Sequence, residues 1–331
     1  MSVVVAGILF LVLMAYAIFG GADFGAGFWD LTAGGAARGR RPRALIDDSI
    51  GPVWEANHVW LIFALVIAWT AFPTVFAAVM RTLYVPLGLA AFGIVLRGSG
   101  FAFRKVSVRT ATQRAYGATF AASSVLTPFF FGAIAGSIAT GRVPATGGTG
   151  PLEAWVTPTC LFTGALAVAT CAYLAAVLLT AEARRRAEPV LERYFRARAG
   201  AAAAGAGVVS AAGLAVVHTA APHLFHRLLT AGLPFVLISM VAGLGVLGLL
   251  GRADPRLLRL LAFAAVGSVI AGWGVAQYPD LLGDHARLAD VAAPTPTLVS
   301  VLVVFAAAAV LCLPSLGVLY ALHQQGRLEG G

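Results

Sequence analysis

The amino-acid sequence predicts an all-α polytopic membrane protein with nine transmembrane helices. Its 331 residues are 60% hydrophobic and only 11% charged, which lies outside the range of soluble globular domains. Apolar runs long enough to cross a hydrocarbon core, which takes roughly 20 helical residues, occur nine times. The connections between these runs alternate between arginine-rich and arginine-poor. We therefore expect a single integral membrane domain over residues 1–331, without a soluble domain.

The nine predicted spans are separated by connections that hold most of the charged residues. In chain order the spans cover Val3–Ala22, Trp54–Met80, Leu83–Phe103, Tyr116–Thr140, Thr157–Ala181, Ala201–Pro222, Leu228–Leu250, Leu257–Gln277 and Thr297–Leu322. No basic segment precedes the first run, so we expect a retained helix and not a cleaved signal peptide. Pro189 is expected to interrupt a helical extension of the fifth span, and Pro314 to kink the ninth.

Lysine and arginine residues are divided unevenly between the two sides of this predicted helix array. The odd-numbered connections and the C-terminal tail hold 19 of the 23, and each even-numbered connection holds one. Because cytoplasmic loops carry the excess of basic residues, we expect the N-terminus outside and the C-terminus in the cytoplasm. Nucleic-acid binding is not expected, since it needs cations clustered on one face and here they are spread loop by loop.

The stretch from Gly51 to Pro73 places polar side chains at the start of an apolar span. Glu55 and His58 are three residues apart and project about 60° from each other on a helix, whereas Trp60 faces away from Glu55. A carboxylate at the centre of a membrane span costs about 2.5–3.5 kcal/mol, so it usually faces a bundle interior or a water path. A proton relay would explain why Glu55 and His58 lie together at the start of an apolar span. A hydrogen-bonded pair that only fixes helix packing is the alternative.

A second acid is expected at a similar depth in the membrane. The glycine-rich segment Gly20–Asp30 lets helices approach closely and contains Asp23. The first helix descends to the cytoplasm at Asp23 and the second rises from it at Glu55, so the two acids are expected to meet. The alternative is that Asp23 lies at the end of its helix and is solvated at the lipid headgroups. Arg97 and Arg104 bracket a predicted cytoplasmic turn, where we expect both to reach out to phosphate headgroups.

The cysteines and histidines do not predict a metal site. Cys160, Cys171 and Cys312 lie within apolar runs and lack C-x-x-C spacing, which is typical of packing residues. A bis-histidine haem site needs two histidines at one depth on facing helices. The predicted topology instead puts His218, His223, His226 and His285 at the outer side and His58 and His323 at the inner side. A haem held within this chain is therefore disfavoured, while a single axial ligand or one shared with a partner stays open.

Three motifs resemble subunit II of the cytochrome bd quinol oxidases. They are GADFGAGFWD at residues 21–30, GPVWEANHVWLI at 51–62 and RGSGFAFR at 97–104. The resemblance implies two four-helix bundles plus one peripheral helix, which correspond here to residues 1–140, 157–277 and 297–322. It also implies a haem-carrying partner, subunit I, with two b-type haems, haem d and the quinol-oxidising loop. Such a complex, in the bacterial cytoplasmic membrane, would oxidise quinol and reduce dioxygen to water.

The resemblance also suggests roles for particular residues. Asp23 and Glu55 match acids implicated in a proton path, with His58 beside them, and Trp60 matches a tryptophan near a proposed oxygen route. The remaining motif residues with expected structural roles are Trp54, Asn57, Arg97 and Arg104. A bound quinone, contacts with lipid and a small accessory subunit are compatible with this reading.

The sequence departs from the family pattern at two positions, and it is also compatible with two other classes of function. Many relatives carry acids where this chain has Gly20 and Ala102, so the proton inlet is expected to depend more heavily on Glu55 or to be rerouted. A stand-alone proton-coupled permease would use the same carboxylates to couple solute movement. A purely structural subunit would use them only for packing.

Overall fold

The computed structural model describes residues 1–50, 54–107, 110–283 and 286–324. Within these ranges the regular structure is helical, apart from one isolated bridge between Asp280 and Arg287. Several residues used in the sequence-based predictions lie outside the described part, namely Gly51, Pro52, Val53, Arg109, His285 and Arg327, together with the side chain of His323.

The described helices confirm the predicted all-α membrane fold. They are α1 (Ser2–Leu31), α2 (Ala36–Ile50), α3 (Trp54–Ala71), α4 (Pro73–Thr82), α5 (Tyr84–Val106), α6 (Thr110–Ala139), α7 (Pro158–Arg185), α8 (Pro189–Ala220), α9 (Pro222–Leu229), α10 (Leu233–Leu249), α11 (Pro255–Gln277), α12 (Leu288–Val291) and α13 (Thr295–Gln324). Seven of them are long and apolar enough to cross a membrane, and the count reaches nine when α2 with α3 and α9 with α10 are each taken as one span.

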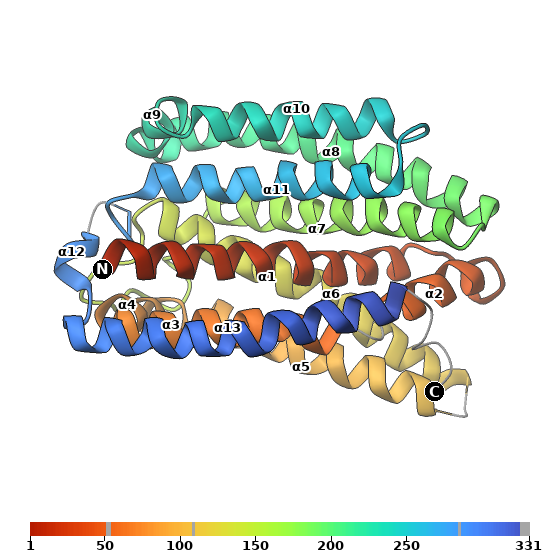
Figure 1. The fold of residues 1–331 in the computed structure, drawn as a ribbon, viewed down its shortest axis with the longest axis horizontal. Coiled ribbons are helices and arrows are strands. Elements are labelled where there is room, and N and C mark those ends of the chain that lie inside the picture. Colours follow the sequence, from red (N-terminus) through yellow and green to blue (C-terminus); the bar gives the residue numbers. More distant parts are fainter. Residues whose placement is uncertain (51–53, 108–109, 284–285, 325–331) are drawn as a thin grey trace.

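The long helices lie side by side, and successive connections alternate between the two ends of the molecule (Figure 1). The N-terminus, α4, α9 and α12 lie at one end, and α2 lies at the other, towards which α13 runs (Figure 1). The connections rich in Arg are all at the end that holds α2, which we call the arginine-rich end. The alternation inferred from loop charges therefore matches the observed topology.

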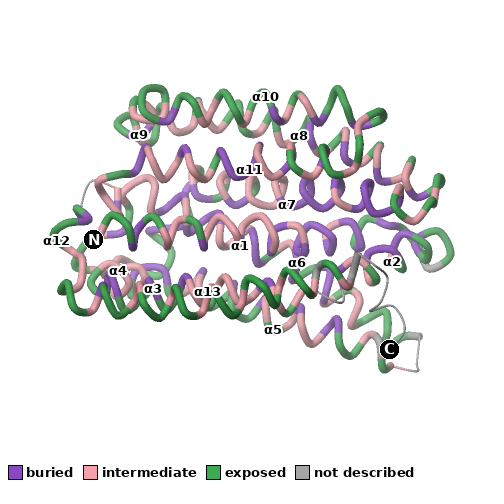
Figure 2. Tube along the Cα trace, in the orientation of Figure 1, coloured by how far each residue is buried: buried purple, intermediate pink, exposed green. Residues whose placement is uncertain are grey.

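Helix α7 is at the centre of the packing, and α13 lies outside it. An unbroken run of α7, Cys171–Val177, is buried, and this helix packs against α1, α6, α8 and α11. Helix α13 contacts mainly α3 and is exposed along most of its length (Figure 2). None of the most apolar window of α13 is buried. The division of the other helices into two four-helix bundles stays a prediction.

Glycines on α1 allow its neighbours to approach closely. A Cβ atom at Gly25 would lie 1.8 Å from the carbonyl oxygen of Cys171 on α7, and one at Gly27 would lie 2.2 Å from Oγ of Ser124 on α6. Both positions exclude any side chain, because real Cβ contacts are longer than 3 Å. Helix α1 is therefore held directly against two helices, which brings its polar residues into the protein interior.

Two local features differ from the sequence-based expectation. The predicted span Trp54–Met80 is divided, since α3 ends at Ala71 and α4 begins at Pro73, where the missing N–H of proline needs no partner. The first helix continues well beyond its apolar run, so that Asp23 lies inside α1 and not at its end.

Candidate functional site

One face of α1 carries a line of polar residues into the molecule. Tyr16, Asp23 and Asp30 are seven residues apart and so share that face, with Gly20 and Gly27 between them. We call Tyr16, Asp23 and Asp30 the α1 polar face. All three residues are buried, and they lie against α3, α5 and α6. Ionisable groups buried in a membrane span mark candidate functional sites.

Asp23 is the acid at the middle of the α1 polar face. It is 5% exposed, and its Oδ2 atom accepts a hydrogen bond from Nδ2 of Asn57 on α3. The same amide also donates to the carbonyl oxygen of Phe19, at 3.4 Å. Arg97 on α5 interacts electrostatically with Asp23. Asp23 is thus a buried carboxylate with one direct amide donor and a guanidinium nearby.

Glu55 does not meet Asp23 in the described structure, contrary to the expected contact between the two acids. Glu55 is exposed in the first turn of α3, and among the described residues no hydrogen bond or ion pair engages it. The reason is helical geometry, since Glu55 and the buried Asn57 are two residues apart and project about 200° from each other. The face of α3 that carries Asn57 packs on α1, and Glu55 faces outward.

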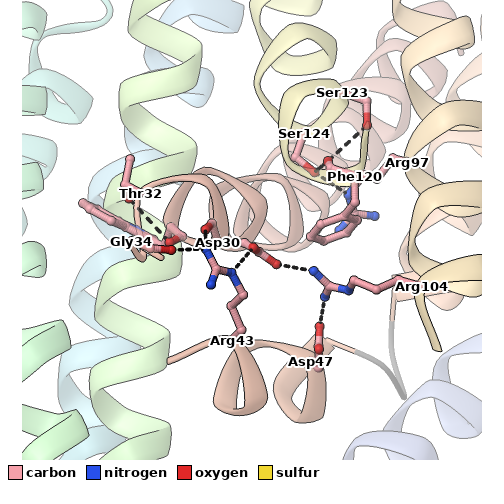
Figure 3. Close-up of polar contacts among 11 residues, drawn as sticks. Asp30, Thr32, Gly34, Arg43, Asp47, Arg97, Arg104, Phe120, Ser123 and Ser124 are labelled. Atoms are coloured by element: carbon pink, nitrogen blue, oxygen red, sulfur yellow. Dashed lines mark hydrogen bonds and ion pairs between the residues drawn. The ribbon is translucent and has the colours of Figure 1, made fainter. Parts of the chain in front are cut away.

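The prediction that Arg97 reaches out to headgroups is wrong. Its side chain is 2% exposed, and its Nε atom donates to Oγ of Ser124 at 3.2 Å (Figure 3). The guanidinium carbon lies 5.0 Å and 5.2 Å from the ring centroids of Phe24 and Phe120, distances typical of cation–π contacts. Helix α5 continues to Val106, so Arg97 is in the helix interior and too far from the end to leave the protein.

Arg104 is also held inside the protein, in a cluster of ion pairs at the arginine-rich end (Figure 3). Its Nη1 atom donates to Oδ2 of Asp30 at 2.6 Å, and its Nη2 atom pairs with Asp47 of α2. Arg43 of α2 donates from Nε to Oδ1 of Asp30 at 2.8 Å. The predicted headgroup contact of Arg104 is therefore wrong. This cluster connects α1, α2 and α5 at the Asp30 end of the α1 polar face.

His58 and Trp54 border the site on α3. The half-buried His58 ring lies with its centroid 6.2 Å from that of Tyr16 and 6.0 Å from that of Trp54. Trp54 packs edge-on against Phe101 of α5, with centroids 5.8 Å apart. His58 is thus close to the α1 polar face, as expected from the sequence, although Glu55 is not. Tyr16 was missed altogether, although its seven-residue spacing from Asp23 was a usable signal.

Trp60 faces a separate, apolar site. A cavity of about 80 Å³ lies between α3 and α13. Its lining consists of Val59, Trp60, Phe63, Phe305, Ala309, Cys312, Leu313 and Leu316. On its other side the Trp60 ring stacks on Phe19 of α1, with centroids 6.5 Å apart. An apolar cavity of this kind stays dry and accepts small apolar molecules.

The described residues do not bring metal ligands together. They contain no group of three or more His, Cys, Asp or Glu side chains placed to hold a metal ion. Cys160 and Cys171 are buried free thiols inside helices, and Cys312 borders the Trp60 cavity. The described part of the chain thus offers buried ionisable groups and an apolar cavity.

Comparisons with known proteins are consistent over the length of the chain. The family model described as cytochrome bd terminal oxidase subunit II matches residues 1–323. A solved structure, the bd oxidase from Geobacillus thermodenitrificans, superposes with a TM-score of 0.77, and the match covers 100% of this chain and 99% of that one. At 22% identity this likeness shows the shared fold.

Two curated relatives align over shorter segments. Cytochrome bd ubiquinol oxidase subunit 2 of Bacillus subtilis is 32% identical over 84 residues, which are 25% of this chain and 24% of that protein. Cytochrome bd-I ubiquinol oxidase subunit 2 of Escherichia coli K12 is 28% identical over 131 residues, or 40% of this chain and 34% of that protein. The aligned segments thus span only a quarter to a third of these relatives.

The Asp30 cluster is expected to contribute more to stability than an exposed ion pair at the same end. Asp30→Asn removes the shared carboxylate and leaves Arg43 and Arg104 with an unbalanced charge, which should cost on the order of 3 kcal/mol of unfolding free energy. Glu188→Gln is the control, because the Arg41–Glu188 pair is 56% and 42% exposed and should contribute at most about 1 kcal/mol. Thermal unfolding of the two variants in detergent measures the difference. Equal losses would contradict the structural role of Asp30.

Proposed function

Because the chain belongs to the cytochrome bd terminal oxidase subunit II family, we propose that it is the second subunit of a membrane-bound quinol oxidase. Its partner, subunit I, carries haems b and d and oxidises quinol, and the complex reduces dioxygen to water. The chain itself supplies scaffold and proton access. The observation that carries this role is the buried Asp23, held by Asn57 and close to Arg97 inside the membrane-spanning helices.

Proton access is divided between an exposed and a buried acid. Glu55, exposed in the first turn of α3, collects protons, and His58 lies one helical turn further along the same helix. Asp23 is the buried acceptor. Its carboxylate accepts a hydrogen bond from Asn57 and lies near Arg97, so both partners hold it in place inside the helix bundle.

The complex lies in the bacterial cytoplasmic membrane with the arginine-rich end of this chain in the cytoplasm. Helices α1 and α13 run from the opposite end towards this one, so the N-terminus is outside and the C-terminus inside (Figure 1). Glu55 begins α3 at the arginine-rich end, where a cytoplasmic proton source can reach it.

Dioxygen reaches the haems through the cavity beside Trp60. The cavity has an apolar lining and is of a size suited to a diatomic molecule, and α13 closes it towards the lipid side of α3. Bound quinone, lipid and a small accessory subunit are compatible with this assembly.

Removing either acid should slow the assembled oxidase. Asp23→Asn and Glu55→Gln each abolish proton exchange at nearly constant size, so quinol oxidase turnover should fall by about 100-fold. Glu153→Gln is the control, because Glu153 is an exposed acid in the connection before α7. Turnover is measured by oxygen consumption, normalised to haem content. Normal turnover in both variants at full haem content would refute the proton role.

The proposed orientation predicts where fused reporters are active. A fluorescent protein that folds only in the cytoplasm should be bright after Gly331 and dark before Met1, because the two ends of an odd number of spans lie on opposite sides. A periplasmic phosphatase at the same two positions should give the reverse pattern. Bright fluorescence at the N-terminal fusion would overturn the assignment.

Filling the Trp60 cavity should hinder dioxygen without affecting proton transfer. Ala309→Phe places a ring into the cavity and should raise the KM for dioxygen severalfold with kcat unchanged. Ala307→Phe is the matched control, since Ala307 is exposed on α13 about 200° from Ala309. Oxygen-dependent turnover measures both. An unchanged KM in Ala309→Phe would exclude this cavity from the oxygen route.

A further inference from the structure

Tyr16 is a buried polar residue that lies outside the proposed proton route through Glu55, His58 and Asp23. Its side chain is 8% exposed and lies along α1 over Gly20, where a Cβ atom would be only 3.0 Å from the Tyr16 ring. The ring packs edge-on against Phe24 and Phe131, with centroids 6.4 Å and 5.9 Å away. Gly20 thus provides the space for the ring, and two aromatic contacts fix its position.

Three buried polar atoms, one on Tyr16 and two on neighbouring helices, have no hydrogen-bond partner among the described residues. They are the Tyr16 hydroxyl on α1, Nδ1 of His58 on α3 and Nη2 of Arg97 on α5. The Tyr16 and His58 rings are neighbours, and Arg97 interacts electrostatically with both residues. The Arg97 guanidinium and the Tyr16 ring also flank the same side chain, Phe24. Three helices therefore contribute polar atoms to one buried region.

The same region extends to α6. The Thr127 hydroxyl is fully buried and also has no partner among the described residues. A Cβ atom at Gly93, one turn before Arg97 on α5, would lie 2.3 Å from Oγ1 of Thr127, so this hydroxyl faces α5. The charged or titratable groups that surround the region are Asp23, His58, Arg97 and the Cys171 thiol of α7.

Buried polar groups in proteins almost always have a hydrogen-bond partner, and an internal water typically makes about three such bonds. The three atoms are chemically complementary around a water molecule. The Arg97 guanidinium can only donate hydrogen bonds, whereas the Tyr16 hydroxyl can both donate and accept them. Nδ1 of His58 donates or accepts a hydrogen bond, depending on the tautomer of the ring. We propose that Tyr16, His58 and Arg97 bind an internal water that carries protons onward from Asp23.

This inference rests on the proposed proton role of Asp23 and names the next step of that route. A proton arriving at the water passes to the Tyr16 oxygen or to His58 while another leaves from the far side of the same group. Each transfer moves one proton, changes no oxidation state and needs no co-reactant. Tyr16 and Arg97 hold the water in place. The proton path consists of the water, the Tyr16 hydroxyl and the His58 imidazole.

Tyr16→Phe tests the proposal, because it removes only the hydroxyl and keeps the ring contacts. In the assembled oxidase, proton uptake and turnover should fall about tenfold, less than the ~100-fold effect of removing Asp23 or Glu55, since another water can partly replace the hydroxyl. The solvent deuterium isotope effect on turnover should rise. Tyr173→Phe is the matched control, as Tyr173 is a buried tyrosine of α7 whose hydroxyl also has no hydrogen-bond partner in the described part of the chain. Equal turnover and an equal isotope effect in the two variants would overturn the proposal.

A pair of His58 variants provides a second test, which does not require the Tyr16→Phe variant to assemble into the oxidase. Asparagine places a polar atom near the position of Nδ1, whereas glutamine places one near Nε2. His58→Asn should therefore retain most of the turnover and His58→Gln should lose it, at equal haem content. The reverse order would contradict the proposal. If turnover is slow in Asp23→Asn but normal in Tyr16→Phe and His58→Gln, only the proposed water site is refuted. If turnover is also normal in Asp23→Asn, the proposed proton role of Asp23 is refuted as well.

Discussion

A charged side chain inside a membrane-spanning helix has to find its partners within the protein, because hydrocarbon offers none. The polar architecture of this chain follows from that constraint. Asp23 is held by Asn57 and faces the charge of Arg97, and Asp30 is held by Arg43 and Arg104. These contacts connect α1 with α2, α3 and α5. The glycines that let α1 approach its neighbours are thus as important to the site as the charged groups themselves.

The fold was largely predictable from sequence because its main signals are long and repeated. Nine apolar runs and an alternating charge pattern each involve tens of residues, so single misjudgements do not change the result. The fate of individual arginines was not predictable. Arg97 and Arg104 have the sequence context of headgroup contacts. Arg97 is buried because α5 continues well beyond it, and Arg104 is turned inward because it pairs with Asp30 of α1.

The partners of the two motif acids were also beyond sequence reasoning. Similar depth on adjacent helices suggested that Asp23 and Glu55 would meet, but depth does not specify which face of α3 turns towards α1. In the structure Asn57 occupies that face and Glu55 points outward. Helical phase did separate Trp60 from Glu55 correctly. Helix α3 consequently divides the molecule, with the α1 polar face on one side and the apolar cavity against α13 on another. Protons and dioxygen need opposite surroundings, and this division would separate the proposed proton route from the proposed dioxygen route.

Tyr16 and Gly20 also limit how this chain can change over evolutionary time. The ring of Tyr16 occupies the space where any side chain at position 20 would begin. A side chain at position 20 would therefore require the Tyr16 ring to move, because its Cβ atom would lie only 3.0 Å from the ring. An aromatic ring at position 16 and a side chain at position 20 therefore compete for the same space on α1, so the residue at one position constrains the residue at the other.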